Sequence, residues 1–265
     1  MELEALSFLL LGLIQGLTEF LPVSSSGHLT LGQSLLGLQE EDLTFTVLVH
    51  AATALSTLVV FRTDLSDLLT SVTASGKNGT QGRAYLGFLL LSAVPAALIG
   101  LGFKEDIEAL ANPRFVGAML WVTAGVLFLS QKASGGNRPL RALQALGIGV
   151  AQAMAILPGI SRSGSTIGAA LILGVSREEA AKFSFLMALI PIGGATLLTL
   201  LELFDQPTVA ETVEVPWLGY AVGTAAAFAS GWAACTWMIR LVKRSNLAGF
   251  GVYCFVVGSL AMIFG

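Results

Sequence analysis

The chain has 265 residues, of which 54% are hydrophobic and 12% charged, and its mean hydropathy is +0.79. This composition is too apolar for a water-soluble domain of that size and indicates an integral membrane protein. The formal net charge of −3 is small and spread over the connecting segments, without the basic run that a nucleic-acid partner would require.

The chain opens with an apolar segment that we expect to be retained, because Glu2 and Glu4 precede it where a signal peptide carries basic residues. Its apolar arm from Ala5 to Leu17 would span roughly 20 Å as a helix, which is too short to cross about 30 Å of hydrocarbon. Pro22 removes a backbone donor and clashes with the preceding turn, so the helix should break near it. The segment therefore predicts a re-entrant helical hairpin.

Polar side chains gather in the stretch QGLTEFLPVSSSGH at 15–28. Gln15 and Glu19 are four residues apart, so both project from one face of a helix. A carboxylate at membrane depth needs a cationic partner. We interpret Glu19 and Gln15 as ligands of a divalent metal ion, with a purely structural ion pair between Glu19 and Arg162 as the alternative.

Three serines, Ser24, Ser25 and Ser26, follow the predicted break. One serine is enough to cap the next helix, whereas three favour a further role. The N-terminus of a helix presents free N–H groups and a positive dipole end, which bind phosphate oxygens well. His28 follows closely and could act as a general acid, a general base or a phosphoryl acceptor, or simply make a hydrogen bond between helices.

Continuous apolar runs of the length of a membrane-crossing helix follow, without the alternation of a membrane β-barrel. The predicted spans are 43–61, 84–103, 115–131, 183–204, 216–239 and 247–264. His50, inside the first span, is expected to make a hydrogen bond between helices and is not counted as catalytic. Cys235 and Cys254 also lie inside spans and are interpreted as small buried residues.

The sequence repeats itself. GLTEFLPVSSSG at 16–27 parallels AMAILPGISRSG at 153–164, and the segments at 85 and 122 parallel those at 217 and 255 in the same order. We therefore expect two repeats, 1–132 and 139–265, each with one re-entrant hairpin and three spans. Three spans per repeat invert the second repeat. The predicted fold is an all-α polytopic membrane protein with an inverted-topology repeat, six transmembrane helices and two re-entrant helical hairpins that meet near the midplane.

The distribution of charge gives an orientation. Of the fourteen basic residues, eleven fall in the connections 62–83, 132–141, 174–182 and 240–246. The alternate connections are largely acidic, as at 39–42 and 205–214. The positive-inside rule then predicts that the basic connections are cytoplasmic and that both termini lie outside. The first hairpin would enter from outside and the second from the cytoplasm.

The second hairpin carries PGISRSGST at 158–166, whose groups suit a diphosphate. Arg162 is the only basic residue predicted to lie deep in the membrane, and its guanidinium can fork onto two phosphate oxygens. A Walker-type phosphate loop is absent, which argues against ATP. The residues expected to bind substrate are Ser24, Ser26, Gly159, Ser161, Ser163, Ser165 and Thr166.

QGLTEFLPVSSSGH and LPGISRSGST resemble the two signature motifs of the bacterial undecaprenyl-diphosphate phosphatase family of the bacitracin-resistance type, and the resemblance covers essentially the whole chain. The first family motif has Glu or Gln and then Glu, which Gln15 and Glu19 match; the second matches 158–166 at every fixed position. Because this chain has the neutral Gln15 where the family motif also allows Glu, Glu19 would carry more of any metal binding. The resemblance implies hydrolysis of the C55 lipid diphosphate to the monophosphate carrier used in cell-wall synthesis, with Mg²⁺ or Ca²⁺, in the bacterial inner membrane.

In the expected mechanism, Ser25 attacks the terminal phosphorus or positions a water that does, and His28 handles protons. Glu19 holds the metal, and Arg162 neutralises charge on the transferred phosphoryl group. The polyprenyl tail requires an opening to lipid, and a site open to the outside suits a lipid released on the outer leaflet. The oligomeric state, monomer or homodimer, is left open.

The alternative class is a secondary transporter or flippase of a polyprenyl phosphate or another anion, since inverted repeats with broken helices also build carriers. A carrier needs affinity without a nucleophile. The clustering of a serine, a histidine, a carboxylate and an arginine therefore favours the phosphatase.

Overall fold

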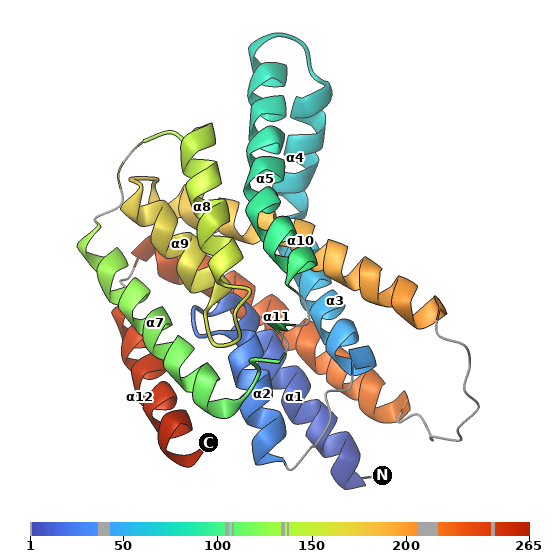
Figure 1. Ribbon diagram of the computed structural model, residues 1–265. Coiled ribbons are helices and arrows are strands. Elements are labelled where there is room, and N and C mark those ends of the chain that lie inside the picture. The colour runs from blue at the N-terminus through green and yellow to red at the C-terminus, as the bar shows by residue number, and fades with distance from the viewer. Residues whose placement is uncertain are drawn as a thin grey trace.

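The computed structural model describes residues 2–36, 43–103, 106–107, 109–133, 136, 138–205, 217–244 and 247–265. The described part is built from helices, with one isolated β-bridge between Arg138 and Val175. The helices are α1 (Glu2–Phe20), α2 (Ser25–Leu35), α3 (Leu43–Val60), α4 (Arg62–Thr73), α5 (Gly76–Gly102), α7 (Pro113–Lys132), α8 (Ala142–Met154), α9 (Arg162–Ile172), α10 (Arg177–Asp205), α11 (Trp217–Arg244) and α12 (Ala248–Phe264) (Figure 1).

Each predicted span corresponds to a helix, namely α3, α5, α7, α10, α11 and α12. Within the described residues, four of these helices, α5, α7, α10 and α11, are long and apolar enough to cross a membrane individually. The pair α3 and α4, bent by 71°, would be a fifth if it is counted as one span. The shorter apolar helices include α1, α8 and α12. The chain is therefore an all-helical, multi-pass membrane protein.

The first helix ends where the break at Pro22 was predicted. Helix α1 runs to Phe20, three residues past the apolar arm at 5–17, and the polar side chains that follow the arm find partners inside the helix. Thr18 Oγ1 donates to the carbonyl of residue 14 at 2.6 Å, and Gln15 Nε2 donates to Glu19 at 3.0 Å. The helix then stops directly before Leu21, as the backbone clash of the following proline predicts.

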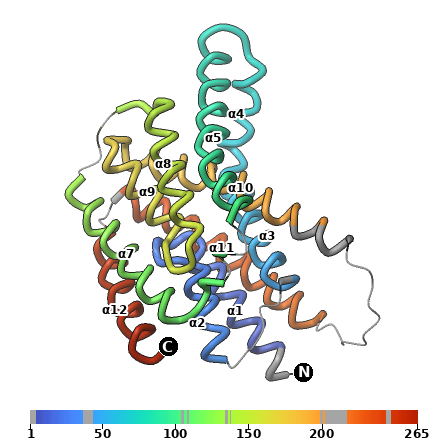
Figure 2. Tube along the Cα trace, in the orientation of Figure 1, coloured from blue at the N-terminus to red at the C-terminus, as the bar shows by residue number. Residues whose placement is uncertain are grey.

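The prediction that the basic connection 62–83 is a loop is wrong. It forms α4 and the first turns of α5, which together project from one end of the molecule (Figure 2). Helix α4 is polar overall but amphipathic, and Leu65 and Leu68 pack against the main core. The connections at 174–182 and 240–246 are likewise mostly helical, since α10 begins at Arg177 and α11 ends at Arg244. The acidic connections predicted at 39–42 and 206–214 lie outside the described residues.

The two halves of the chain interlock through close helix contacts. Helix α1 packs along α11, α8 packs along α5, and α7 pairs with α12. At the first contact, a Cβ placed on Gly12 would lie 2.1 Å from the carbonyl oxygen of Gly223. At the second, a Cβ on Gly149 would lie 2.5 Å from the carbonyl of Ser92. Small residues thus let the backbones approach closely, which replaces the hydrophobic driving force that lipid cannot provide.

Candidate active site

Two helix breaks meet inside the bundle. The first, at 21–24, separates α1 from α2, and the second, at 155–161, separates α8 from α9. Ser163 Oγ of the second segment donates to the carbonyl of Leu21 in the first at 2.9 Å. Gly159, in the second break, has φ +96°, and a Cβ there would lie 2.5 Å from the carbonyl of residue 116, so only glycine fits. The sequence prediction that the two motifs approach each other is confirmed.

Both broken helices restart with the same serine cap. Ser24 Oγ accepts from the backbone N–H of residue 27 at 3.3 Å, and Ser161 Oγ accepts from that of residue 164 at 3.1 Å. Each cap also lies 3.3 Å from the hydroxyl of the serine two positions later, Ser26 or Ser163. Among the described residues Ser24, with φ +72°, is the one non-glycine residue with positive φ. The cap serines therefore fix the N-termini of α2 and α9 at the meeting point.

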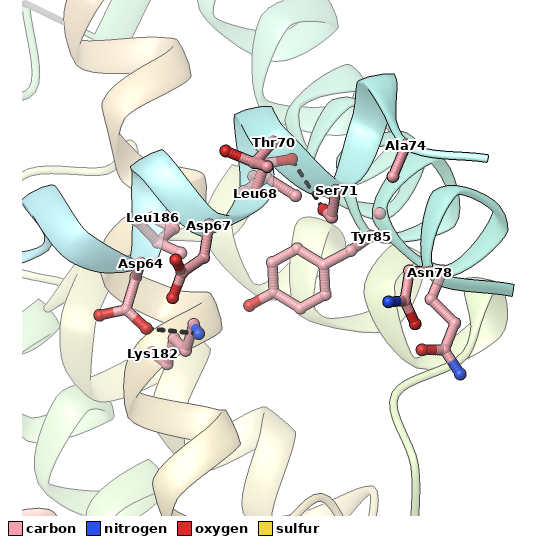
Figure 3. Close-up of a pocket in the computed structure, with 12 residues that line it drawn as sticks. Asp64, Asp67, Leu68, Thr70, Ser71, Ala74, Asn78, Tyr85, Lys182 and Leu186 are labelled. Atoms are coloured by element: carbon pink, nitrogen blue, oxygen red, sulfur yellow. Dashed lines mark hydrogen bonds and ion pairs between the residues drawn. The ribbon is translucent and has the colours of Figure 1, made fainter. Parts of the chain in front are cut away.

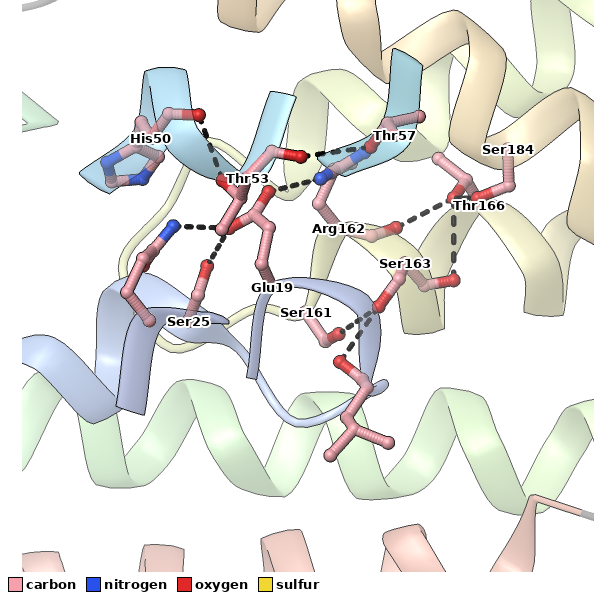
Figure 4. Close-up of polar contacts among 12 residues, drawn as sticks. Glu19, Ser25, His50, Thr53, Thr57, Ser161, Arg162, Ser163, Thr166 and Ser184 are labelled. Carbon is pink, nitrogen blue, oxygen red and sulfur yellow. Dashed lines mark hydrogen bonds and ion pairs between the residues drawn. The ribbon is translucent and has the colours of Figure 1, made fainter. Parts of the chain in front are cut away.

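Glu19 is the centre of the polar cluster (Figure 4). One carboxylate oxygen forms an ion pair with Arg162 of α9. The other accepts from Ser25 Oγ at 2.5 Å and from Gln15 Nε2 at 3.0 Å. Glu19 is 7% exposed and Gln15 is fully buried. The structure thus brings together four predicted site residues, and the Glu19–Arg162 ion pair that we considered as an alternative is present.

His28 lies apart from this cluster. Its Nδ1 is 2.8 Å from the carbonyl oxygen of Ser24, so this nitrogen donates. Its Nε2 then accepts from the hydroxyl of Tyr253 on α12 at 2.8 Å, and the two rings stack with centroids 5.6 Å apart. Neither contact reaches Glu19. The histidine is therefore oriented by a tyrosine that sequence reasoning did not identify.

The remaining predicted binding residues are buried on α9. Thr166 donates to the carbonyl of Arg162 at 2.8 Å and shares a 2.5 Å hydrogen bond with Ser184 of α10. Ser165 is 6% exposed and follows the cap of the same helix. The Thr166 side chain ties α9 to α10, and the structure does not show a hydrogen bond from either residue to Glu19.

Helix α3 supplies a polar wall that sequence reasoning missed. His50, Thr53 and Thr57 lie on one face of α3, beside Glu19 and Arg162 (Figure 4). Thr53 and Thr57 are buried. The inter-helix hydrogen bond predicted for His50 is wrong: Nδ1 donates to the carbonyl of Thr46 in the same helix at 2.8 Å. The spacing of three polar residues at 50, 53 and 57 is the signal that could have identified this face.

A divalent cation at this site would need oxygen ligands from the protein. Gln15 Oε1 is buried and has no hydrogen-bond partner among the described residues, and Glu19 lies one helical turn away. Within the same residues, no group of three or more His, Cys, Asp or Glu side chains could hold a metal ion. Two oxygen ligands fit an ion that substrate phosphates and water complete, as is usual for Mg²⁺.

A separate pocket of about 500 Å³ opens between α4, α5 and α10 (Figure 3). Asp64, Asp67, Tyr85 and Lys182 line it, and Lys182 forms a 2.5 Å ion pair with Asp64. None of the predicted site residues borders this pocket. The candidate active site is therefore the Glu19 cluster and not this pocket.

Comparison with known proteins gives a consistent result. The profile of the family described as "Bacitracin resistance protein BacA" matches residues 8–260. An undecaprenyl-diphosphatase of Christiangramia forsetii is 47% identical over 97% of this chain and 96% of its own. Proteins of the same name from Syntrophotalea carbinolica and Bacteroides fragilis are 46% and 41% identical, over 95% and 98% of both chains.

Proposed function

The chain belongs to the BacA bacitracin-resistance family, and from that membership we infer that it is an undecaprenyl-diphosphatase. It hydrolyses undecaprenyl diphosphate to undecaprenyl phosphate and inorganic phosphate, which returns the lipid carrier to cell-wall synthesis. The relatives named above are diphosphatases, and no observation on this chain favours the carrier or flippase considered from the sequence. The multi-pass helical architecture suits the bacterial inner membrane.

The observation that carries the residue assignment is the convergence of a hydroxyl, a carboxylate and a guanidinium on two helix N-termini. Ser25 begins α2, Arg162 begins α9, and both contact Glu19. Free N–H groups and the positive ends of two helix dipoles add to the charge of Arg162. This arrangement favours a phosphate group between the two helices.

Ser25 is the proposed nucleophile. Its hydroxyl attacks the terminal phosphorus, or positions the water that does so, and the bond to the bridging oxygen of the lipid phosphate breaks. Arg162 turns from Glu19 toward the phosphoryl oxygens and stabilises the charge that develops on them. Ser24, Ser26, Ser161 and the other binding residues predicted from the sequence keep the two N-termini aligned with the phosphate.

The divalent cation, Mg²⁺ or Ca²⁺, would be held by Glu19 and Gln15 Oε1. When bound, it supplies charge neutralisation for the diphosphate. His28 transfers protons to or from the substrate. To do so, its Nε2 must release the hydroxyl of Tyr253 and bind a substrate oxygen instead.

The proposed architecture is the inverted repeat with two re-entrant hairpins. Three observations support it: the matching serine caps, the pairing of each hairpin arm with a helix of the other half, and the position of both termini at the end opposite α4 and α5 (Figure 2). With the basic connections in the cytoplasm, the first hairpin and the site open to the outside. The substrate tail then leaves sideways into the bilayer.

The test is phosphate release from a C55 lipid diphosphate by the purified protein in detergent, with and without EDTA. Arg162→Ala serves as the inactive control. Metal-dependent release that the variant loses would support both the phosphatase and its site. Binding of the lipid diphosphate without release, by a protein shown to be folded, would favour the carrier instead.

A further inference from the structure

The pocket between α4, α5 and α10 has a rigid frame. A Cβ placed on Gly82 of α5 would lie 2.2 Å from Ser71 Oγ of α4, so the two helices approach closely there. Arg83 Nη1 donates to the carbonyls of residues 72 and 74 at 3.1 and 3.3 Å, which satisfies the C-terminal end of α4. The pocket is therefore preformed, and its volume of about 500 Å³ lies in the range of small-molecule sites, roughly 300–1,000 Å³.

The α4 wall of this pocket offers mainly hydrogen-bond acceptors. Thr70 Oγ1 donates to the carbonyl of residue 66 at 2.8 Å and Ser71 Oγ donates to that of residue 68 at 2.7 Å, so both hydroxyl oxygens can only accept further hydrogen bonds. Asp67 lies one turn after Asp64 on the same wall. Its carboxylate has no ion-pair partner within the described ranges of the chain. A ligand on this wall must therefore donate.

The opposite wall leaves polar atoms unsatisfied. The Tyr85 hydroxyl points toward the side of the pocket where Asp67 and Lys182 lie (Figure 3), and it is buried without a hydrogen-bond partner among the described residues. Glu179 Oε1, one turn before Lys182 on α10, is also buried and unpartnered in that part of the chain, so the two groups do not satisfy each other. The Lys182 ammonium is already paired with Asp64 at 2.5 Å. Buried polar atoms are nearly always paired, so a bound molecule is expected here.

We propose that this pocket is a binding site for a small organic cation, an alkyl amine or a guanidinium compound. Such a group brings several N–H donors and no acceptor, which matches the free carboxylate of Asp67 and the two hydroxyl oxygens. Its positive charge balances the excess of carboxylates over the single Lys182 ammonium, and the ring of Tyr85 adds a face for a cation. No group of three or more His, Cys, Asp or Glu side chains in the described residues could hold a metal ion, which favours an organic cation. The proposal does not depend on the hydrolase activity, because the pocket shares no residue with the Glu19 cluster.

Calorimetric titration of the purified full chain, in neutral detergent at fixed ionic strength, tests the site with spermidine and agmatine as probes. We expect saturable binding of at least one probe at one site, with a Kd below about 1 mM. Asp67→Asn removes the free charge at nearly unchanged shape and should raise that Kd about tenfold or more, because hydrogen bonds to charged groups are the strong ones. Tyr85→Phe should raise it about threefold. Asp106→Asn is the matched control: it removes an exposed carboxylate beyond the far end of α5 and should leave the Kd within about twofold.

Binding that weakens in Asp67→Asn and persists in Asp106→Asn would support the site. Equal weakening in both variants would show that amines are attracted to acidic surface in general, and it would overturn the proposal. The proposal is also overturned if neither probe gives saturable binding up to about 10 mM. Because Asp67 is exposed on α4, the variant is expected to fold, and an unchanged Tm checks this. A chain that binds the amine but releases no phosphate would refute the hydrolase and leave this site standing.

Discussion

Removing Arg162 tests how strongly the site depends on its central ion pair. The side chains of Arg162 and Glu19 are 17% and 6% exposed, so Arg162→Ala leaves a carboxylate that water hardly reaches. Breaking a buried pair from one side costs about 3–5 kcal/mol. Because Ser25 and Gln15 still donate to the other carboxylate oxygen, we expect the lower end, about 3 kcal/mol. For a chain of this length the apparent Tm should fall by roughly 6–12 °C.

The double variant Glu19→Gln/Arg162→Ala distinguishes charge from packing. It removes the unpaired carboxylate, so it should recover much of the lost Tm, measured by tryptophan fluorescence in detergent. Phosphate release should fall by about 10²–10³ in Arg162→Ala, the cost of losing an electrostatic stabiliser of the transition state, and should not recover in the double variant. A wild-type Tm in Arg162→Ala, or a double variant no more stable than the single one, would refute the desolvated ion pair.

Further predictions concern the nucleophile, its neighbour, the helix packing and the metal. Ser25→Ala should lower phosphate release by at least about 100-fold in a protein that remains folded; activity retained there but lost in His28→Ala would transfer the nucleophile role to histidine or water. Tyr253→Phe removes the hydrogen bond, worth about 1 kcal/mol, that His28 Nε2 must give up before it can bind a substrate oxygen, so kcat should not fall, and a loss of about fivefold or more would contradict this exchange. Gly12→Ala should destabilise by about 1–3 kcal/mol, because its Cβ meets the α11 backbone, whereas Gly193→Ala, with open space around it, should leave Tm unchanged or raise it, and equal Tm changes would contradict this packing. EDTA should abolish release and Mg²⁺ restore it; full activity in EDTA would exclude the Glu19–Gln15 metal site.

The sequence predicted the helices better than their ends. Apolar runs and the helix-breaking Pro22 depend on local chemistry, so helices occupy the six predicted segments and the first break appears where expected. The extension of α1 to Phe20 depends on side-chain hydrogen bonds within the helix, which an apolar count cannot detect. Helix α4 was missed because its apolar residues are few, and its stability comes from Leu65 and Leu68 packing against the core.

The site was predictable as far as its motifs extend. Glu19, Ser25 and Arg162 were identified because each is unusual in an apolar segment, and in the structure the other two both contact Glu19. The contact of Tyr253 with His28 was not predicted, because a single polar residue inside a span gives no indication of which helix it faces, and the neighbours of His50 were not predicted for the same reason. Such contacts depend on how α3 and α12 pack, which is long-range information.

The pairing of α1 with α11 has a consequence for biosynthesis. The first arm is complete at Phe20, but the helix against which it packs begins at Trp217, so nearly the whole chain must be made before that contact can form. Glu19 likewise waits for Arg162 before it has a cationic partner. Contacts between such distant segments form late in folding. The candidate active site is therefore among the last parts to assemble, and a nascent chain in the translocon lacks this site until its final helices have entered the bilayer.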